Sequence, residues 1–424
     1  MTQHSRLSWS SWVEQSCGLV EAAGQWRRPR TFDARGPAGR LGDPPDGAEP
    51  DAAGPDAALP DEGLPDEALS DEGLPDEGLP DVVSFASNDY LGLSSHPDVV
   101  HAAHRALDRW GAGAGASRLV TGSRPVHREL EGALAAWKGC ARAMVYPTGF
   151  AANLSVLSVF GAEGAHVYSD AWNHASIIDG CRLARAPVTV YPHGDLDRLD
   201  AELDGAEGRP VVVTDTVFSM DGDQADLGGL MAVARRHGAL VVLDEAHAVL
   251  GPEPVQAEGV DVLRVGTLSK TLGSLGGFVA GPARFVELLV NRARPYIFTT
   301  APTPADAAAA LAAVSIVRSD EGDRLRSRLA AHVDRVARAV GAVGHPSPIV
   351  PVVIGNEEDA VAASAALLDR GLWVPAIRPP TVPRGTSRLR VTLSAVHTDE
   401  QVDRLVDGLV GLAPLRARLG SRAS

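Results

Sequence analysis

Two side chains that could carry chemistry lie at the ends of two apolar runs. ALVVLDEAH places Asp244 at the end of one run, with His247 three residues on. DVLRVGTLSK places Lys270 at the end of the next run, 26 residues after Asp244. Lys270 is one of two lysines, with Lys138, in a chain of 39 basic residues. Because arginine supplies positive charge elsewhere, Lys270 indicates a need for an amine that can lose its proton.

A lysine and a carboxylate at one edge of a sheet suit pyridoxal 5'-phosphate. The amine forms a Schiff base with the aldehyde of this cofactor, and the carboxylate keeps the pyridine nitrogen protonated. Two opposite charges at about 4 Å attract by about 4 kcal/mol when the effective dielectric is near 20. The protonated ring then accepts electrons from a substrate carbanion. Asp244 and Lys270 therefore predict this cofactor.

Two further loops offer groups for the phosphate and the ring. YPTGFAAN follows an expected strand and opens an expected helix, where the N–H groups of Gly149, Phe150 and Ala151 face an anion site. Thr267, beside the lysine, can add a hydroxyl. SDAWNHASIIDG places His174 after another strand, where its imidazole can stack on the cofactor.

These motifs allow other interpretations. A lone lysine after a strand is usually a surface charge, and a strand-end aspartate is often a cap. DEAH also resembles the acidic box of helicase-type nucleotidases, but that function needs a GxxxxGK[ST] loop, and neither lysine follows a glycine. GAGAGAS, residues 111–117, lacks the GxGxxG spacing of a dinucleotide site and follows DRW rather than a strand.

Apolar, β-branched runs alternate with helical stretches through the middle of the chain. The expected strands cover 141–146, 166–170, 187–192, 209–216, 239–245 and 261–267. Their spacing is typical of βαβ units and predicts an α/β fold with a mainly parallel sheet, which binds ligands at its carboxyl edge. Expected helices near 304–318 and 322–341, with strands near 349–354 and 386–393, predict a smaller α+β domain.

The first eighty residues differ from this body. Residues 41–81 contain 14 acidic and no basic residues, and a five-residue repeat with frequent proline runs from Asp56 to Pro80. Proline and high charge predict a disordered insertion, either an acidic interaction tail or a tolerated low-complexity expansion. We therefore expect an arm over 1–41, the insertion over 42–80, a cofactor-binding domain over 81–300 and a small domain over 301–424.

Composition limits the partners and the compartment. Without residues 41–81 the chain has 40 acidic and 39 basic residues, which provides no basic field for nucleic acid. The sequence has neither an 18-residue apolar run nor the layout of a secretory signal, so no membrane span is expected. Three distant cysteines indicate no disulfide framework and no metal site, which predicts a cytoplasmic protein.

Eight motifs together resemble the α-oxoamine synthases, which are fold-type I pyridoxal phosphate enzymes. Members of this family condense an amino acid with an acyl thioester and release carbon dioxide. The motifs are SNDYLGLSSHP (87–97), GAGASRLVTGS (113–123), HRELEGALAAW (127–137), TGFAAN (148–153), VFSMDGD (217–223), LDEAH (243–247), TLSKTLGSLGG (267–277) and SDEGDRLR (319–326). The resemblance spans about residues 85–400 and implies a homodimer with its sites at the subunit interface.

The resemblance implies a role for each matched residue. The catalytic residues implied are Lys270 as the Schiff-base lysine, Asp244 as the partner of the pyridine nitrogen, His174 as the stacking ring and His247. Ser219 and His247 are implied to donate to the phenolic oxygen of the cofactor. Gly149, Phe150 and Thr267 are implied to bind the phosphate, with Thr300 given by the neighbouring subunit.

The resemblance also implies a substrate site. Arg390, the last arginine of RLR, is implied to bind the substrate carboxylate with its bidentate fork. Asn88 is implied to assist Arg390, and Thr381 to contact the substrate. An N-terminal arginine, Arg27 or its neighbour Arg28, is implied to contact the substrate as well.

One stretch narrows the implied reaction. IRPPTVPRGTSRLRVTL, residues 377–393, is similar to the biotin-pathway branch of the family. That branch joins L-alanine to pimeloyl-CoA or pimeloyl acyl carrier protein to form 8-amino-7-oxononanoate. Two alternatives remain: a member that uses glycine, serine or another acyl chain, and a non-catalytic cofactor-binding protein, against which the retained site residues argue.

Overall fold

The computed structural model describes residues 8–27, 29–42, 81–252 and 258–412. The predicted acidic insertion therefore lies outside the described residues, apart from residue 42. The chain divides into two compact units, residues 1–34 with 38–82 and residues 35–37 with 83–424. The expected boundary between a cofactor-binding and a small domain at residue 300 stays a prediction.

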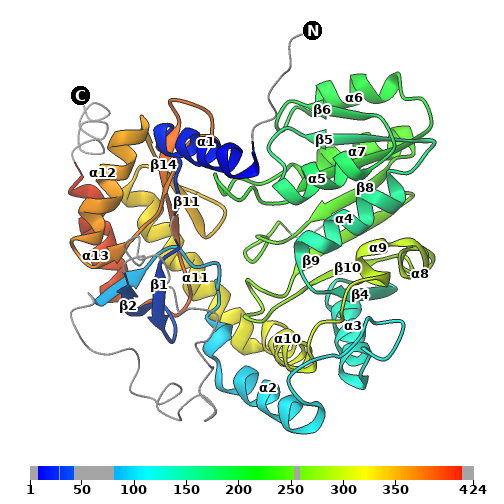
Figure 1. Ribbon diagram of the computed structural model, residues 1–424, viewed down its shortest axis with the longest axis horizontal. Helices are drawn as coiled ribbons and strands as arrows, with labels where there is room; N and C mark the ends of the chain where they lie inside the picture. Colours follow the sequence, from blue (N-terminus) through cyan, green and yellow to red (C-terminus); the bar gives the residue numbers. More distant parts are fainter. Residues whose placement is uncertain (1–7, 28, 43–80, 253–257, 413–424) are drawn as a thin grey trace. The chain divides into compact units, whose positions relative to one another are not determined.

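Figure 1 labels most of the helices and strands. In chain order they are α1 (Trp9–Ala22), β1 (Thr31–Ala34), β2 (Ala38–Gly42), β3 (Asp81–Ser84), the 3-10 helix η2 (Leu93–Ser95), α2 (Pro97–Trp110), α3 (Pro125–Trp137), β4 (Arg142–Tyr146), α4 (Gly149–Phe160), β5 (Ala165–Asp170), α5 (Ala175–Leu183), β6 (Val188–Tyr191), α6 (Leu196–Asp204), β7 (Arg209–Asp215), α7 (Leu227–His237), β8 (Leu240–Asp244), β9 (Val262–Thr267), β10 (Gly277–Gly281), α8 (Ala283–Arg292), α9 (Arg294–Ile297), α10 (Pro304–Val317), α11 (Asp320–Ala339), β11 (Ile349–Gly355), α12 (Glu357–Leu368), β12 (Leu372–Trp373), β13 (Ala376–Ile377), β14 (Ser387–Thr392) and α13 (Asp399–Val410).

The first unit contains a helix and a hairpin. The side chain of Ser8 caps α1 by accepting the N–H of Ser11 at 3.2 Å. Strands β1 and β2 pair antiparallel, with Thr31 opposite Gly42. Arg27 lies between α1 and this hairpin, within the same unit.

The second unit is built on a seven-stranded sheet in the order β4-β10-β9-β8-β7-β5-β6. Strands β9, β8, β7, β5 and β6 are parallel neighbours, and β10 pairs antiparallel with both β4 and β9. The mainly parallel α/β fold and all six predicted strands of the sheet are thus confirmed. β10 was missed because its sequence, GFVAG, is short and bounded by glycine, which is a poor signal for a strand.

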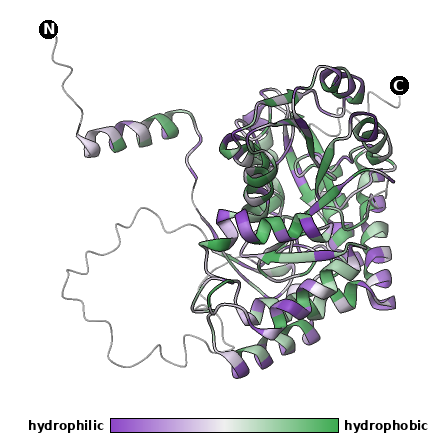
Figure 2. Cartoon of the chain, turned by 90° about the vertical axis from the view of Figure 1, so that its right-hand side faces the viewer, coloured by the Kyte–Doolittle hydropathy of each residue, from purple (hydrophilic) through white to green (hydrophobic). Residues whose placement is uncertain are grey.

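Both faces of this sheet are covered by apolar side chains. Alternate residues of a strand point to opposite faces. Accordingly Val211 and Val213 of β7 join a cluster with helices α4 and α5, whereas Val212 joins a cluster with α6 and α7. Figure 2 shows the interior strands of this unit mainly in green, while the helices around them carry both colours.

The strand order brings polar strand ends to one edge of the sheet. Because β5, β7, β8 and β9 are parallel, their carboxyl ends, Asp170, Asp215, Asp244 and Thr267, lie along the same edge. Asp215 stands directly opposite Asp244 in the β7–β8 register. This edge is where an α/β sheet is expected to bind its ligand.

A second, three-stranded antiparallel sheet has the order β11-β14-β13. Every residue of its central strand β14 is buried, including Arg388 and Arg390. The strands and helices predicted beyond residue 300 are present near the expected positions, as α10, α11, β11 and β14. Among the described residues, no helix is both long enough and apolar enough to cross a membrane.

Candidate active site

A cavity of about 240 Å³ opens at the carboxyl edge of the seven-stranded sheet. Seven of the predicted site residues line it: Gly149, Phe150, His174, Asp244, His247, Thr267 and Lys270. They come from the last residues of β8 and β9 and from the loops and helix starts that follow β4, β5, β8 and β9. Residues that are up to 121 positions apart in the sequence therefore share one small cavity.

Lys270 and His247 are in direct contact. Lys270 Nζ lies 2.9 Å from His247 Nε2. Burial lowers the pKa of Lys270, and the nearby Arg390 lowers it further, while the carboxylates of Asp244 and Asp215 act in the opposite direction. Lys270 is therefore held in surroundings that favour the neutral amine, which is the form that can act as a base or nucleophile.

Asp244 is fixed by two hydrogen bonds. Its Oδ2 accepts the Nδ2–H of Asn153 at 2.6 Å, and its Oδ1 accepts the N–H of Ala246 at 2.9 Å. The neighbouring Asp215 is almost completely buried, and burial together with the charge of Asp244 raises its pKa well above the usual range. Asp215 is thus expected to be protonated, which leaves Asp244 as the carboxylate that can face a cationic ring nitrogen.

His174 caps the helix α5 that follows β5. Its Nδ1 lies 2.8 Å from Ser176 Oγ, and its backbone N–H donates to Asp215 Oδ2 at 2.7 Å. Burial lowers the pKa of His174, so the imidazole is neutral near pH 7. The ring of Phe150 meets it edge-on, with 6.5 Å between the ring centroids.

The start of α4 fits the cofactor's phosphate. Thr148 caps this helix and its Oγ1 accepts the N–H of Ala151, one of the three expected donors, at 3.0 Å. The N–H groups of Gly149 and Phe150 belong to the first turn, where a helix leaves its donors without internal partners. Thr267 Oγ1 lies within 2.7 Å of Ser269 Oγ, and both residues line the same cavity.

Arg390 is linked to this cavity through Asn88 and Tyr90. Its Nη2 donates to Asn88 Oδ1 at 3.2 Å, and its Nε donates to the carbonyl oxygen of Ser219 at 2.6 Å. Tyr90 Oη lies 3.1 Å from Asn88 Oδ1 and 2.5 Å from His247 Nδ1, and it can donate its one proton to either of them. A guanidinium with its orientation fixed in this way can receive a carboxylate.

Besides Arg390 and Asn88, four predicted residues do not line this cavity. Ser219 contributes its carbonyl oxygen to Arg390, as described above. Thr300 is exposed and bridges to Ser117, and Thr381 is exposed in the turn before β14. Arg27 belongs to the first unit. The roles of these four residues stay predictions.

Sequence reasoning did not select four other residues of the site. Asp215, Asn153 and Ser176 line the cavity, and Tyr90 contacts His247. Asp215 could have been found, because it ends an expected strand just as Asp244 does. Asn153 and Ser176 lie within motifs that were recognised, but only the hydrogen bonds to Asp244 and His174 show their function.

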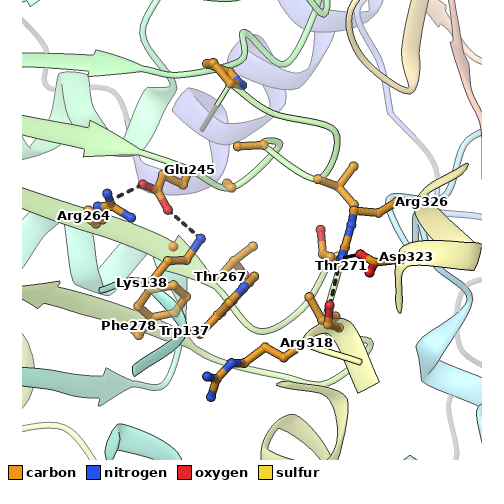
Figure 3. Close-up of a pocket in the computed structure, with 16 residues that line it drawn as sticks. Trp137, Lys138, Glu245, Arg264, Thr267, Thr271, Phe278, Arg318, Asp323 and Arg326 are labelled. Carbon is orange, nitrogen blue, oxygen red and sulfur yellow. Dashed lines mark hydrogen bonds and ion pairs between the residues drawn. The ribbon is translucent and has the colours of Figure 1, made fainter. Parts of the chain in front are cut away.

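A second cavity, of about 500 Å³, lies beside the first and shares Ala246, Gly266 and Thr267 with it. Figure 3 shows Lys138, the other lysine of the chain, pointing toward Glu245, with Arg264 on the far side of the carboxylate. Lys138 Nζ lies 2.6 Å from Glu245 Oε2, and these side chains are 13% and 1% exposed. Lys138 thus neutralises a buried carboxylate next to Asp244.

The chain matches the family model for class I and II aminotransferases over residues 80–409, and it belongs to that family. An 8-amino-7-oxononanoate synthase of Burkholderia thailandensis is 48% identical over 347 residues, which cover 78% of this chain and 88% of that protein.

Two solved structures extend the likeness. A serine palmitoyltransferase of Sphingomonas wittichii has a TM-score of 0.80 and 28% identity, and the match covers 98% of this chain and 100% of that one. A serine palmitoyltransferase of S. paucimobilis with a bound PLP–myriocin aldimine has a TM-score of 0.75 and 34% identity, covering 80% of this chain and 88% of that one.

These likenesses confirm the predicted membership of the α-oxoamine synthases and the fold-type I architecture. The protein is an enzyme of the acyltransferase type that uses pyridoxal phosphate. The cavity fits this cofactor, because it combines a desolvated lysine, a fixed carboxylate, a flat imidazole and the open N–H groups of a helix start.

Gly277→Ala is expected to weaken cofactor binding. A Cβ at Gly277 would lie 2.4 Å from the nitrogen of Gly149 and 2.5 Å from the carbonyl carbon of Thr148, so the start of α4 must move. We expect the dissociation constant for pyridoxal phosphate to rise about tenfold, equal to about 1.4 kcal/mol. Titration of cofactor-free protein measures it. Gly132→Ala, where a Cβ meets nothing within 4 Å, is the control, and equal affinities in both variants would contradict the expectation.

Lys138→Met is expected to destabilise the fold. It leaves the carboxylate of Glu245 buried, with Arg264 Nε at 3.6 Å as its remaining cationic partner. Breaking a buried ion pair costs about 3 kcal/mol of the free energy of unfolding. Urea denaturation measures the loss. Arg284→Met removes an exposed partner of Glu287 and should cost less than about 0.5 kcal/mol; a similar small loss in Lys138→Met would rule out a structural role for the buried pair.

Proposed function

We propose that this enzyme condenses L-alanine with a pimeloyl thioester, on CoA or acyl carrier protein, to form 8-amino-7-oxononanoate in biotin biosynthesis. The observation that carries the proposal is the meeting of Lys270, Asp244 and His174 in one cavity of the chain. The choice of substrates rests on the 48% identity to a protein of that name, together with the PPTVP stretch.

Bound pyridoxal phosphate would withdraw electrons from the α-carbon of alanine. The amine of Lys270 takes the α-proton, and burial, which lowers the pKa of Lys270, favours the neutral form that can act as this base. Asp244 holds the positive charge of the ring nitrogen in place, and His174 supports the face of the ring. Ser219 and His247 are proposed to donate to the phenolic oxygen.

Arg390 is proposed to hold the carboxylate of alanine. Asn88, Thr392 and the carbonyl oxygen of Ser219 accept three of the five N–H groups of its guanidinium, which leaves two to donate to a carboxylate. The α-carbon of alanine then bonds to the thioester carbonyl carbon as the carrier thiol leaves. The alanine carboxylate departs as carbon dioxide, and the same carbon takes up a proton in its place. Thr381 and Arg27 are proposed to contact the substrate.

A homodimer is part of this proposal. Three large apolar side chains near Thr300 are exposed: Leu119 by 53%, Val120 by 73% and Phe298 by 69%. Their segments adjoin, because Ser117 bridges to Thr300 and the N–H of Ala301 donates to the carbonyl of Ala116 at 3.0 Å. Burying such a patch against a second copy would remove apolar area from water and offer Thr300 to the partner's cofactor.

A second candidate is a serine-using synthase. Structural likeness favours it, since the serine palmitoyltransferase of S. wittichii has a TM-score of 0.80 over nearly the whole chain. Its 28% identity is well below the 48% of the B. thailandensis protein, so alanine and pimeloyl remain the proposed substrates. We also propose a cytoplasmic location, based on the three distant cysteines.

The substrates are tested by release of free thiol from pimeloyl-CoA with L-alanine, glycine or L-serine. We expect release with alanine alone, together with the mass of 8-amino-7-oxononanoate. Lys270→Ala should lower turnover by several orders of magnitude because no other described amine reaches the cavity. Release with serine but not alanine would favour the second candidate, and undiminished turnover in Lys270→Ala would remove Lys270 from the mechanism.

The dimer is tested with Val120→Asp. A carboxylate in the middle of the apolar patch should oppose association, so that the molar mass in solution falls by half at micromolar concentration. Val343→Asp, at a residue that is 76% exposed in the turn before β11, is the matched control. An unchanged mass in both variants would argue against this interface.

A further inference from the structure

A chain of polar contacts joins the substrate side of the site to Lys270. Arg390 Nη2 donates to Asn88 Oδ1 at 3.2 Å, and Tyr90 Oη lies 3.1 Å from the same oxygen. Tyr90 Oη also lies 2.5 Å from His247 Nδ1, and His247 Nε2 lies 2.9 Å from Lys270 Nζ. Tyr90 is completely buried and His247 nearly so, which means that the contact between these two side chains is not shared with solvent.

Tyr90 has one proton and two neighbours that could accept it. Its contact with His247 Nδ1 is shorter by 0.6 Å than its contact with Asn88 Oδ1, which already accepts a charged donor, Arg390. Burial raises the pKa of Tyr90 and thereby keeps the proton on its hydroxyl. The geometry therefore favours donation from Tyr90 to the imidazole.

His247 has one N–H to place. Burial is the main cause that lowers the pKa of His247 well below its usual value, and the charge of Arg390 acts in the same direction, so the ring is neutral. A neutral imidazole carries its proton on one nitrogen and accepts at the other. If Nδ1 accepts from Tyr90, the proton is on Nε2, which faces Lys270.

We propose that Tyr90 is a positioning residue that holds the His247 proton on Nε2 by donating its own hydroxyl proton to Nδ1. His247 then presents an N–H donor to the cavity. This donor serves the lone pair of a neutral Lys270 and, in the loaded enzyme, the phenolic oxygen of the cofactor. The inference rests on the proposed role of His247 but not on the identity of the substrates.

The opposite direction of these hydrogen bonds fits less well. It would require His247 Nδ1–H to donate to Tyr90, Tyr90 to donate to Asn88, and a Lys270 ammonium to donate to Nε2. Asn88 Oδ1 would then hold two donors, at 3.1 and 3.2 Å. The ammonium would lie in desolvated surroundings near Arg390, although Asp244 and Asp215 would oppose that cost. His247 would also offer the cofactor's oxygen a lone pair, which repels it.

The first test reads the proton position directly. Cofactor-free protein labelled with ¹⁵N-histidine is examined by NMR, and the His247 signals are assigned by their loss in His247→Gln. We expect a protonated Nε2 and an unprotonated Nδ1 in the wild-type protein. A proton on Nδ1 would overturn the proposal, and this measurement needs neither a folded Tyr90 variant nor a substrate.

The second test follows the bound cofactor in Tyr90→Phe without substrates. An N–H donor to the phenolic oxygen favours the anionic oxygen and lowers the apparent pKa of the cofactor's visible band. Loss of the hydroxyl frees His247 to place its proton on Nδ1, so we expect that apparent pKa to rise by about one unit. A titration identical to that of the wild-type protein would overturn the proposal.

The matched control is Tyr168→Phe. Tyr168 Oη lies 3.3 Å from Nδ1 of His166, so this variant also removes a hydroxyl from a Tyr–His contact, but on β5 away from the cavity. It should leave the cofactor titration unchanged, and a shift equal to that of Tyr90→Phe would assign the effect to general destabilisation. If the alanine assay failed while both tests succeeded, the proposed substrates would fall and the role of Tyr90 would stand.

Discussion

The desolvation of one amine is the constraint on which this site depends. Lys270 needs surroundings that favour its neutral form, yet the cofactor needs a carboxylate within the same small cavity. Asp244 and Asp215 both raise the pKa of Lys270, and burial has to outweigh them. Because Asp215 is itself buried beside Asp244, its own pKa rises, which favours its neutral form and weakens one of the two charges that would hold the proton on Lys270.

The pairing of β7 and β8 places the two carboxylates that act on Lys270 side by side. Asp215 and Asp244 face each other because β7 and β8 pair in register at their carboxyl ends. Adjacent residues of an extended segment point in opposite directions, so Asp244 lines the cofactor cavity while Glu245 lines the neighbouring one. The same strand end therefore presents one carboxylate to the chemistry and buries a second, which Lys138 must neutralise.

The site residues that lie in recognisable loop motifs could be predicted from the sequence, whereas contacts that depend on strand pairing could not. Strand ends and helix starts carry Lys270, Asp244, His174 and Gly149, and their residue types are readable in their own loops. The antiparallel β10 was missed because five residues bounded by glycine hold little β-propensity. Its place between β4 and β9 puts Gly277 against Gly149, a contact that no local pattern contains.

The two lysines of the chain show why residue type follows surroundings. Lys138 faces a carboxylate at 2.6 Å and the ring of Trp137 at 3.9 Å, so its positive charge is stabilised on two sides. Lys270 lies 2.9 Å from the neutral imidazole of His247. Its burial and the nearby positive charge of Arg390 both disfavour a positive charge on Lys270. Arginine could replace the first lysine with its charge kept, but it could not replace the second, because a guanidinium does not lose its proton in a protein.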